Sequence, residues 1–159
     1  MKLTTKGRFA VTAVLDLALN ESNNPVSLSD ISKRQSISLS YLEQLFSRMR
    51  RVGLVKSIRG PGGSYKTAID HNTLTVKDII TSVEEQIDAT QCGGNENCHE
   101  GGRCITHNLW ASLNHKILDY LESLTLAQLI DEQKNKTDEH SIYFAPKKIN
   151  MNKDKLEAV

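Results

Sequence analysis

The sequence is 159 residues long, 38% of them hydrophobic, and carries a formal net charge of +1. This length suits one compact domain with a core of its own, so the fold does not need disulfides. No run approaches the ~18 consecutive apolar residues of a membrane span, and the start of the chain lacks the apolar stretch of a secretory signal. We therefore expect a cytoplasmic protein that does not bind membranes.

The charges are unevenly distributed along the chain. Residues 1–66 contain 11 Lys and Arg against 4 Asp and Glu, whereas residues 67–159 contain 9 against 15. Such a division suggests that the first half binds a polyanion. A solubilising surface with accidental segregation is also compatible with the charges alone.

Three helices are predicted in the first third of the chain, over about 5–20, 28–35 and 39–52. Thr4 or Thr5 can cap the first, and Ser27–Asp30 matches a capping box at the start of the second. Ser38 can cap the third, which ends at Gly53, a residue type common just beyond helix ends.

A hairpin is predicted after these helices. Leu54–Ile58 alternates like a strand, Arg59–Gly63 is rich in turn residues, and Ser64–Thr67 can return as the partner strand. Three helices followed by a hairpin, with a short link between the second and third helices, are typical of a winged helix-turn-helix domain. The expected fold class is therefore mainly α with a small β-hairpin wing.

In a helix-turn-helix the second helix of the pair enters the major groove of DNA and its first residues reach the base edges. The predicted base-reading residues, opposite the leucine stripe of that helix, are Ser38, Ser40, Tyr41, Glu43 and Gln44. Arg48, Arg50 and the neighbouring Arg51 suit phosphates better, and Arg59 and Gly60 at the wing tip suit the minor groove and the phosphates.

Glu43 is unusual among these residues because phosphates repel a carboxylate. It can accept a hydrogen bond from a cytosine amino group and so penalise sites without that donor. Alternatively, Glu43 pairs with Arg50 or Lys33 and does not read DNA.

The second half of the chain is expected to be helical around a glycine-rich segment. The predicted helices are one opened by Thr75 and ending near Val83, a long one with an apolar stripe from Ile105 to Leu124, and a short one capped by Thr125. From residue 134 onward the sequence is polar and unpatterned, which is typical of a disordered tail.

All three cysteines lie in the glycine-rich segment. Cys92, Cys98 and Cys104 are each six residues apart, and His107 follows three residues later on the same predicted helix face as Cys104. An odd number of cysteines, all close together in the sequence, argues against a disulfide scaffold and favours metal ligands or redox thiols. The spacing slightly favours a structural zinc site over a 2Fe–2S cluster, with His99 as a competing fourth ligand. A redox enzyme is a further alternative, against which the chain has no flavin or nucleotide fingerprint.

Four stretches resemble a known family. LTTKGRFAVTA (3–13), SDISKRQSISLSYLEQLFSRMRRVGLV (29–55), RGPGG (59–63) and ATQC…C…RCITHNLW (89–110) resemble the IscR-type iron–sulfur cluster regulators, within a wider family of bacterial winged-helix repressors. The resemblance implies a 2Fe–2S cluster on Cys92, Cys98, Cys104 and His107, in place of zinc. In some relatives such cysteines sense nitric oxide or other signals instead.

The resemblance also implies the partners and the regulation. They are a homodimer paired through the long helix, double-stranded DNA at promoters of iron–sulfur assembly genes, and the assembly machinery as cluster donor. Cluster occupancy would select the operators, giving repression and, in some contexts, activation. The expected dimer contacts are Leu109, Leu113, Ile117, Tyr120 and Leu121.

The expected organisation has four parts. They are a winged helix-turn-helix DNA-binding domain (1–85), a cluster-binding loop (86–104), a dimerisation helix with a short C-terminal helix (105–133), and the tail (134–159). Residues 86–104 are called the cysteine loop below.

Overall fold

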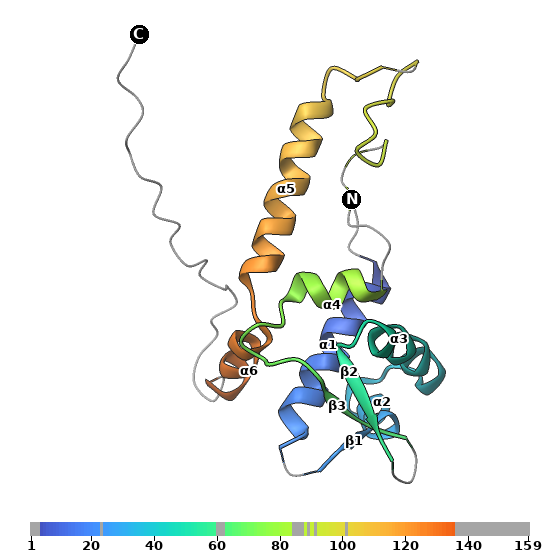
Figure 1. Cartoon of the computed structure of the whole chain (residues 1–159), viewed down its shortest axis with the longest axis vertical. Helices are drawn as coiled ribbons and strands as arrows, with labels where there is room; N and C mark the ends of the chain where they lie inside the picture. The colour runs from blue at the N-terminus through green and yellow to red at the C-terminus, as the bar shows by residue number, and fades with distance from the viewer. Residues whose placement is uncertain are drawn as a thin grey trace.

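The computed structural model describes residues 4–22, 24–59, 63–83, 88, 90, 92–100 and 102–135. In chain order the elements are α1 (Thr5–Asn20), β1 (Val26–Ser27), α2 (Leu28–Gln35), α3 (Leu39–Arg51), β2 (Val55–Ile58), β3 (Ser64–Thr67), α4 (Val76–Val83), α5 (His107–Ser123) and α6 (Leu126–Asn135) (Figure 1). The predicted mainly helical fold with a small wing is confirmed. The predicted tail lies outside the described residues except for its first two, which continue α6.

The predicted caps explain where the first helices begin. The Thr4 hydroxyl accepts from the Gly7 amide, the Ser27 hydroxyl accepts from the Asp30 amide at 3.1 Å, and the Ser38 hydroxyl accepts from the Tyr41 amide at 3.3 Å. Each side chain thus satisfies one of the amides that a helix start leaves without a partner. The starts of α1, α2 and α3 are therefore encoded locally, as the sequence predicted.

The wing is a three-stranded antiparallel sheet in the order β1-β3-β2, where the sequence predicted only a hairpin. β1 is two residues long and pairs Val26 with Tyr65 and Ser27 with Ser64. Two residues are too few to show strand alternation, and β1 exists because β3 lies beside it. Since Ser27 is also the N-cap of α2, the wing is joined directly to the helix-turn-helix.

One hydrophobic core joins these elements. Phe46 of α3 is fully buried and its ring meets that of Tyr65 of β3 edge-on, with centroids 4.9 Å apart. Asp16 of α1 is buried too, and its carboxylate accepts from the side chains of Arg34 and Gln35 at the end of α2. The core therefore fixes α3 against the wing, while the hydrogen bonds of Asp16 with Arg34 and Gln35 fix α2 against α1.

The long helix α5 projects away from this body, and Figure 1 shows it rising beyond α4. His107 is its one buried residue. The chain returns to the body at its lower end, where Leu124 and Leu129 pack with Val76 and Ile80 of α4. No helix in the described part of the chain is long and apolar enough to cross a membrane.

Candidate metal centre and nucleic-acid interface

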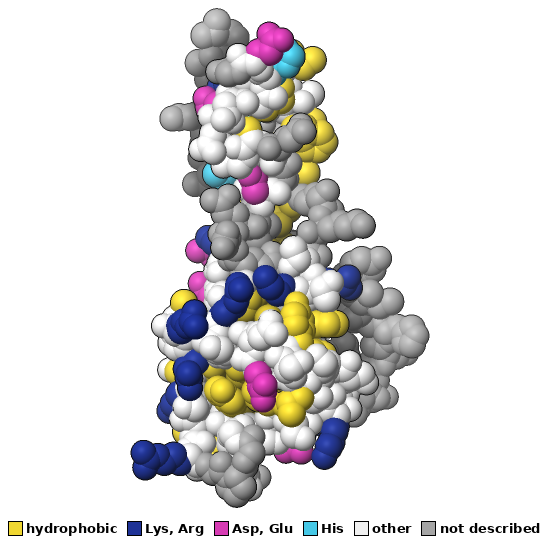
Figure 2. Space-filling model, turned by 90° about the vertical axis from the view of Figure 1, so that its right-hand side faces the viewer, with side chains coloured by type: hydrophobic (Ala, Val, Ile, Leu, Met, Phe, Trp, Pro, Cys, Tyr) yellow, Lys and Arg dark blue, Asp and Glu magenta, His cyan; other side chains and the backbone are white. Residues whose placement is uncertain are grey.

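The start of α3 presents most of the predicted base-reading side chains to solvent. Ser38, Ser40, Glu43 and Gln44 are exposed, while Tyr41 is half-buried, its ring 5.9 Å from that of Phe9. Figure 2 views the side of the body on which α3 lies, and Lys and Arg side chains are spread over it around apolar patches. The basic side chains on this face are of the kind that contacts DNA phosphates, and the individual base contacts stay predictions.

Among the arginines predicted to contact phosphates, Arg48 also makes a hydrogen bond within the protein. Arg50, Arg51 and Arg59 are exposed, and Gly60 lies outside the described residues. Arg48 donates from Nη1 to the carbonyl of Val83, at 2.9 Å. Val83 is the last residue of α4, so Arg48 connects α3 to the point where the chain leaves for the cysteine loop. The sequence does not reveal this contact, because the two residues are far apart in the chain.

Glu43 is exposed, and the ion pairs found within the described residues include neither of its predicted partners, Arg50 and Lys33. Its carboxylate therefore faces the solvent that DNA would displace.

We expect Glu43→Ala to relax base preference at one or two operator positions by about 1–3 kcal/mol, because the penalty for lacking a donor disappears. Selection of binding sites from a random DNA pool measures this effect. An unchanged sequence preference would contradict a selective role for Glu43.

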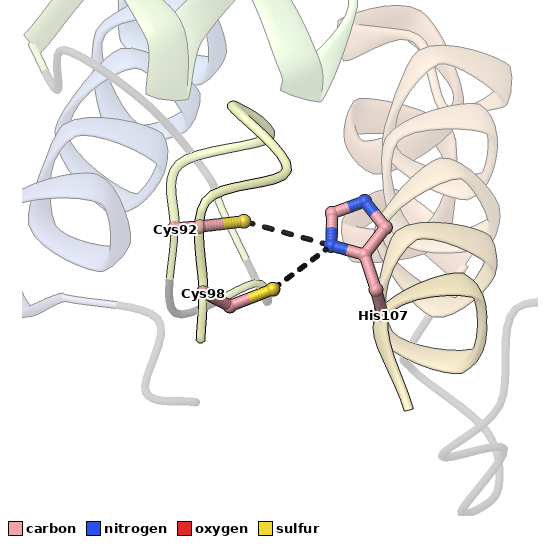
Figure 3. Close-up of side chains that lie close together, drawn as sticks. All are labelled: Cys92, Cys98 and His107. Carbon is pink, nitrogen blue, oxygen red and sulfur yellow. Dashed lines mark hydrogen bonds between the residues drawn. The ribbon is translucent and has the colours of Figure 1, made fainter. Parts of the chain in front are cut away.

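Two cysteines of the cysteine loop and the first residue of α5 converge, with both sulfur atoms pointing toward the His107 ring (Figure 3). His107 Nδ1 lies 3.6 Å from Cys92 Sγ and 3.5 Å from Cys98 Sγ. All three ligand atoms lie within 4.8 Å of one another, a spacing that lets them share one metal centre. His107 is 5% exposed and the two cysteines are half-buried, so the donors are partly shielded from solvent.

The fourth predicted ligand is near but not in this group. The Cys104 amide donates to Cys98 Sγ at 3.2 Å, whereas the Cys104 thiol lies 3.7 Å from Thr106 Oγ1. The prediction that Cys104 and His107 share a helix face is wrong, because α5 begins at His107 and Cys104 precedes it. His99 is exposed, and among the described residues it does not join the group.

The surroundings of the thiols move their pKa values in different directions. Partial desolvation raises the pKa of Cys92, but hydrogen bonds with the Thr90 hydroxyl and the Glu96 and Gly94 amides outweigh it and bring the pKa to about 7. The Cys104 amide lowers the pKa of Cys98, yet desolvation and the neighbouring thiols leave it raised. The Thr106 hydroxyl lowers the pKa of Cys104. A substantial fraction of Cys92 is thus a thiolate, the metal-binding form, at neutral pH.

In metal-free protein we expect alkylation of Cys92 by iodoacetamide to accelerate as the pH rises and to reach half its maximal rate near pH 7. Only the thiolate reacts, so the rate follows its fraction. Cys98 serves as an internal reference, since its raised pKa places its half-maximal rate at a higher pH. Mass spectrometry of quenched, digested samples measures both rates, and equal pH profiles would contradict the assignment.

A cavity of about 570 Å³ lies between α4, the cysteine loop and α5. Its wall includes Lys77 and Thr81 of α4, Asp88 and Thr90 of the loop, and His107 and Asn114 of α5. Of the three donors, His107 lines this cavity.

The predicted dimer contacts lie on α5. Leu109 and Tyr120 are 60% and 40% exposed, and Leu113, Ile117 and Leu121 are half-buried. Trp110, which the stripe did not include, is 42% exposed beside Leu109.

Comparison with known proteins identifies the family of this fold. The sequence profile of Rrf2, described as an iron-dependent transcriptional regulator, matches residues 3–132. The chain belongs to the Rrf2 family. Its Rrf2 relatives include the HTH-type transcriptional regulator IscR of Yersinia pseudotuberculosis, which is 55% identical over 133 residues, covering 84% of this chain and 81% of that protein.

Solved structures agree with the Rrf2 assignment. IscR of T. potens superposes with a TM-score of 0.72 at 33% identity, covering 88% of this chain and 93% of that one. CymR, the global cysteine regulator of B. subtilis, superposes with a TM-score of 0.71 at 33% identity, covering 83% and 98%. The chain is therefore an IscR-like, DNA-binding winged-helix transcription regulator and not an enzyme.

Proposed function

We propose that this Rrf2 regulator holds a 2Fe–2S cluster on Cys92, Cys98, Cys104 and His107, and that occupancy of this site changes which DNA it binds. The convergence of Cys92 Sγ, Cys98 Sγ and His107 Nδ1 within 4.8 Å carries the proposal. Three thiolates and one imidazole form a complete set of soft and borderline ligands, so the residues fit the cluster. The IscR names of its relatives support the same cofactor.

Cys104 needs only a local change to complete the ligand set. Its amide already donates to Cys98 Sγ, so its backbone is in place, and its thiol interacts with both the Cys98 thiol and Thr106 Oγ1. A small movement of this side chain toward Cys92 and His107 would bring in the third thiolate. The neutral, protonatable imidazole of His107 is a weaker ligand than a thiolate, which suits a site that is emptied when clusters are scarce.

The contacts of α4 suggest how the site reaches DNA. α4 leads into the cysteine loop at Val83, and Arg48 of α3 holds the Val83 carbonyl. Ordering of the loop would bias the end of α4 and, through Arg48, the DNA-facing helix. Pairing of two chains through Leu109, Leu113, Ile117, Tyr120 and Leu121 would present two such helices to half-sites about 34 Å apart.

The biological setting follows from these assignments. The regulator would act in the cytoplasm on promoters of iron–sulfur assembly genes, and would receive its cluster from the assembly machinery whose genes it controls. Repression at high occupancy would close a feedback loop, with activation at other promoters.

The test is purification without oxygen, followed by a visible spectrum, iron and sulfide analysis, and DNA binding before and after cluster removal. Two irons and two sulfides per chain, with altered affinity for an assembly-gene promoter after removal, are expected. A colourless, zinc-containing protein whose DNA binding ignores chelation would overturn the proposal and leave a zinc-stabilised winged-helix DNA binder. A cluster that a chelator does not remove but that nitric oxide destroys would favour a nitric oxide sensor.

A further inference from the structure

The first cysteine sits at the corner of a tight turn. Cys92 and Asn95 close the turn through a hydrogen bond from the Asn95 amide to the Cys92 carbonyl, at 3.2 Å. The two central residues, Gly93 and Gly94, have φ values of +64° and +81°. Positive φ at both central positions is the requirement of a type I′ turn, and glycine meets it without strain. This turn sets where Cys92 Sγ lies relative to His107.

Thr90 braces that turn from outside. Its Oγ1 accepts from the Gly94 amide at 2.8 Å, and Cys92 Sγ lies 3.8 Å from the same oxygen. A threonine hydroxyl has one proton and two acceptor sites, so it can accept from Gly94 while it donates its own proton to another group.

Asp88 accepts a hydrogen bond from the Thr90 hydroxyl. Its Oδ2 accepts from Thr90 Oγ1 at 2.9 Å, and its Oδ1 accepts from the Thr90 amide at 2.7 Å. The carboxylate thereby fixes the Thr90 side chain, with an acceptor site of Oγ1 aimed at the Gly94 amide. Hydrogen bonds to a carboxylate are short and strong, which suits an anchoring role.

We infer that Asp88 and Thr90 are positioning residues for the metal centre, acting as a two-step brace that holds the Cys92–Asn95 turn in ligand-binding geometry. Neither residue binds metal in this arrangement. The inference rests on the proposed cluster site and adds two residues that its cysteine and histidine pattern does not contain. Groups that orient ligands in this way commonly contribute 10-fold to 100-fold in metal affinity.

The test compares four variants with the wild type. Thr90→Val keeps the shape of the side chain and removes its hydrogen bonds, Thr90→Ser keeps the hydroxyl, and Asp88→Ala removes the anchor. Thr81→Val is the matched control, because Thr81 lines the same cavity but its hydroxyl donates only to backbone carbonyls of its own helix, those of Lys77 and Asp78.

Two readouts are measured on the full chain. One is the rate at which an iron chelator removes the cluster from protein purified without oxygen. The other is the Co²⁺ dissociation constant of the cluster-free protein, followed by thiolate-to-Co²⁺ absorption. Thermal unfolding and promoter binding of the cluster-free variants verify that each one folds.

Thr90→Val and Asp88→Ala are expected to release the cluster about 10-fold to 100-fold faster and to weaken Co²⁺ binding similarly, with unfolding unchanged. Thr90→Ser and Thr81→Val should behave as the wild type. Wild-type behaviour of Thr90→Val, or a Thr90→Ser protein as impaired as Thr90→Val, would overturn the inference. If the wild type holds no cluster, the proposed function fails, while the Co²⁺ series still decides whether Asp88 and Thr90 position the ligands.

Discussion

Replacing Cys98 with serine is expected to yield a protein that purifies with less than about a tenth of the wild-type iron and sulfide. Cys98 is the central donor, because its Sγ contacts both His107 Nδ1, at 3.5 Å, and the Cys104 amide, at 3.2 Å. Serine offers a hard, protonated oxygen in place of a soft thiolate. Iron and sulfide analysis with the visible spectrum measures the loss.

The folded state should survive this change, since Cys98 belongs to neither of the two apolar clusters. His99→Ala is the matched control: His99 neighbours Cys98, is exposed, and pairs with Gly102 through backbone atoms only. We expect this control to keep its cluster. Full cluster content in Cys98→Ser, or equal loss in both variants, would show that the donors are assigned wrongly.

Phe46→Ala is expected to lower the free energy of unfolding by about 3–5 kcal/mol. Phe46 is fully buried and packs its ring against Tyr65, so truncation leaves a cavity between α3 and the wing. A domain of this size is stable by roughly 5–15 kcal/mol. The substitution would therefore remove a large part of the free energy that keeps the protein folded. Urea unfolding followed by circular dichroism gives the value.

The matched control for this prediction is Val52→Ala, immediately after α3. Val52 is 60% exposed, and we expect a change within about 0.5 kcal/mol. A loss below about 1 kcal/mol for Phe46→Ala would mean that the core relaxes around the missing ring or that α3 and the wing are coupled elsewhere.

Local chemistry made most of the fold predictable. Residue type and position predicted Ser27 and Ser38 as caps and left Thr4 or Thr5 for the first helix; Thr4, Ser27 and Ser38 are the caps in the structure. β1 was missed because its two residues carry no pattern of their own and depend on β3. The end of α6 was placed two residues early, since a polar helix end resembles the polar segment that follows it.

The sequence predicted the metal ligands of the site but not the residues that position them. Residue type and spacing single out Cys92, Cys98 and His107, which the fold brings together. The place of Cys104 just before α5 depends on where that helix starts, and no side-chain cap marks the start in the sequence. The brace by Asp88 and Thr90 depends on side-chain geometry, for which aspartate and threonine in a loop give no distinct sequence signal.

The hydrogen bond between Arg48 and Val83 has a thermodynamic consequence. It joins α3, the helix proposed to read DNA, to the last residue of α4, the element that leads to Cys92. Linkage is reciprocal: if filling the metal site changes affinity for an operator by some factor, that operator changes affinity for the filled site by the same factor. Promoter DNA would then act as an effector of cofactor retention, so two promoters that differ in sequence would stabilise the filled site to different extents.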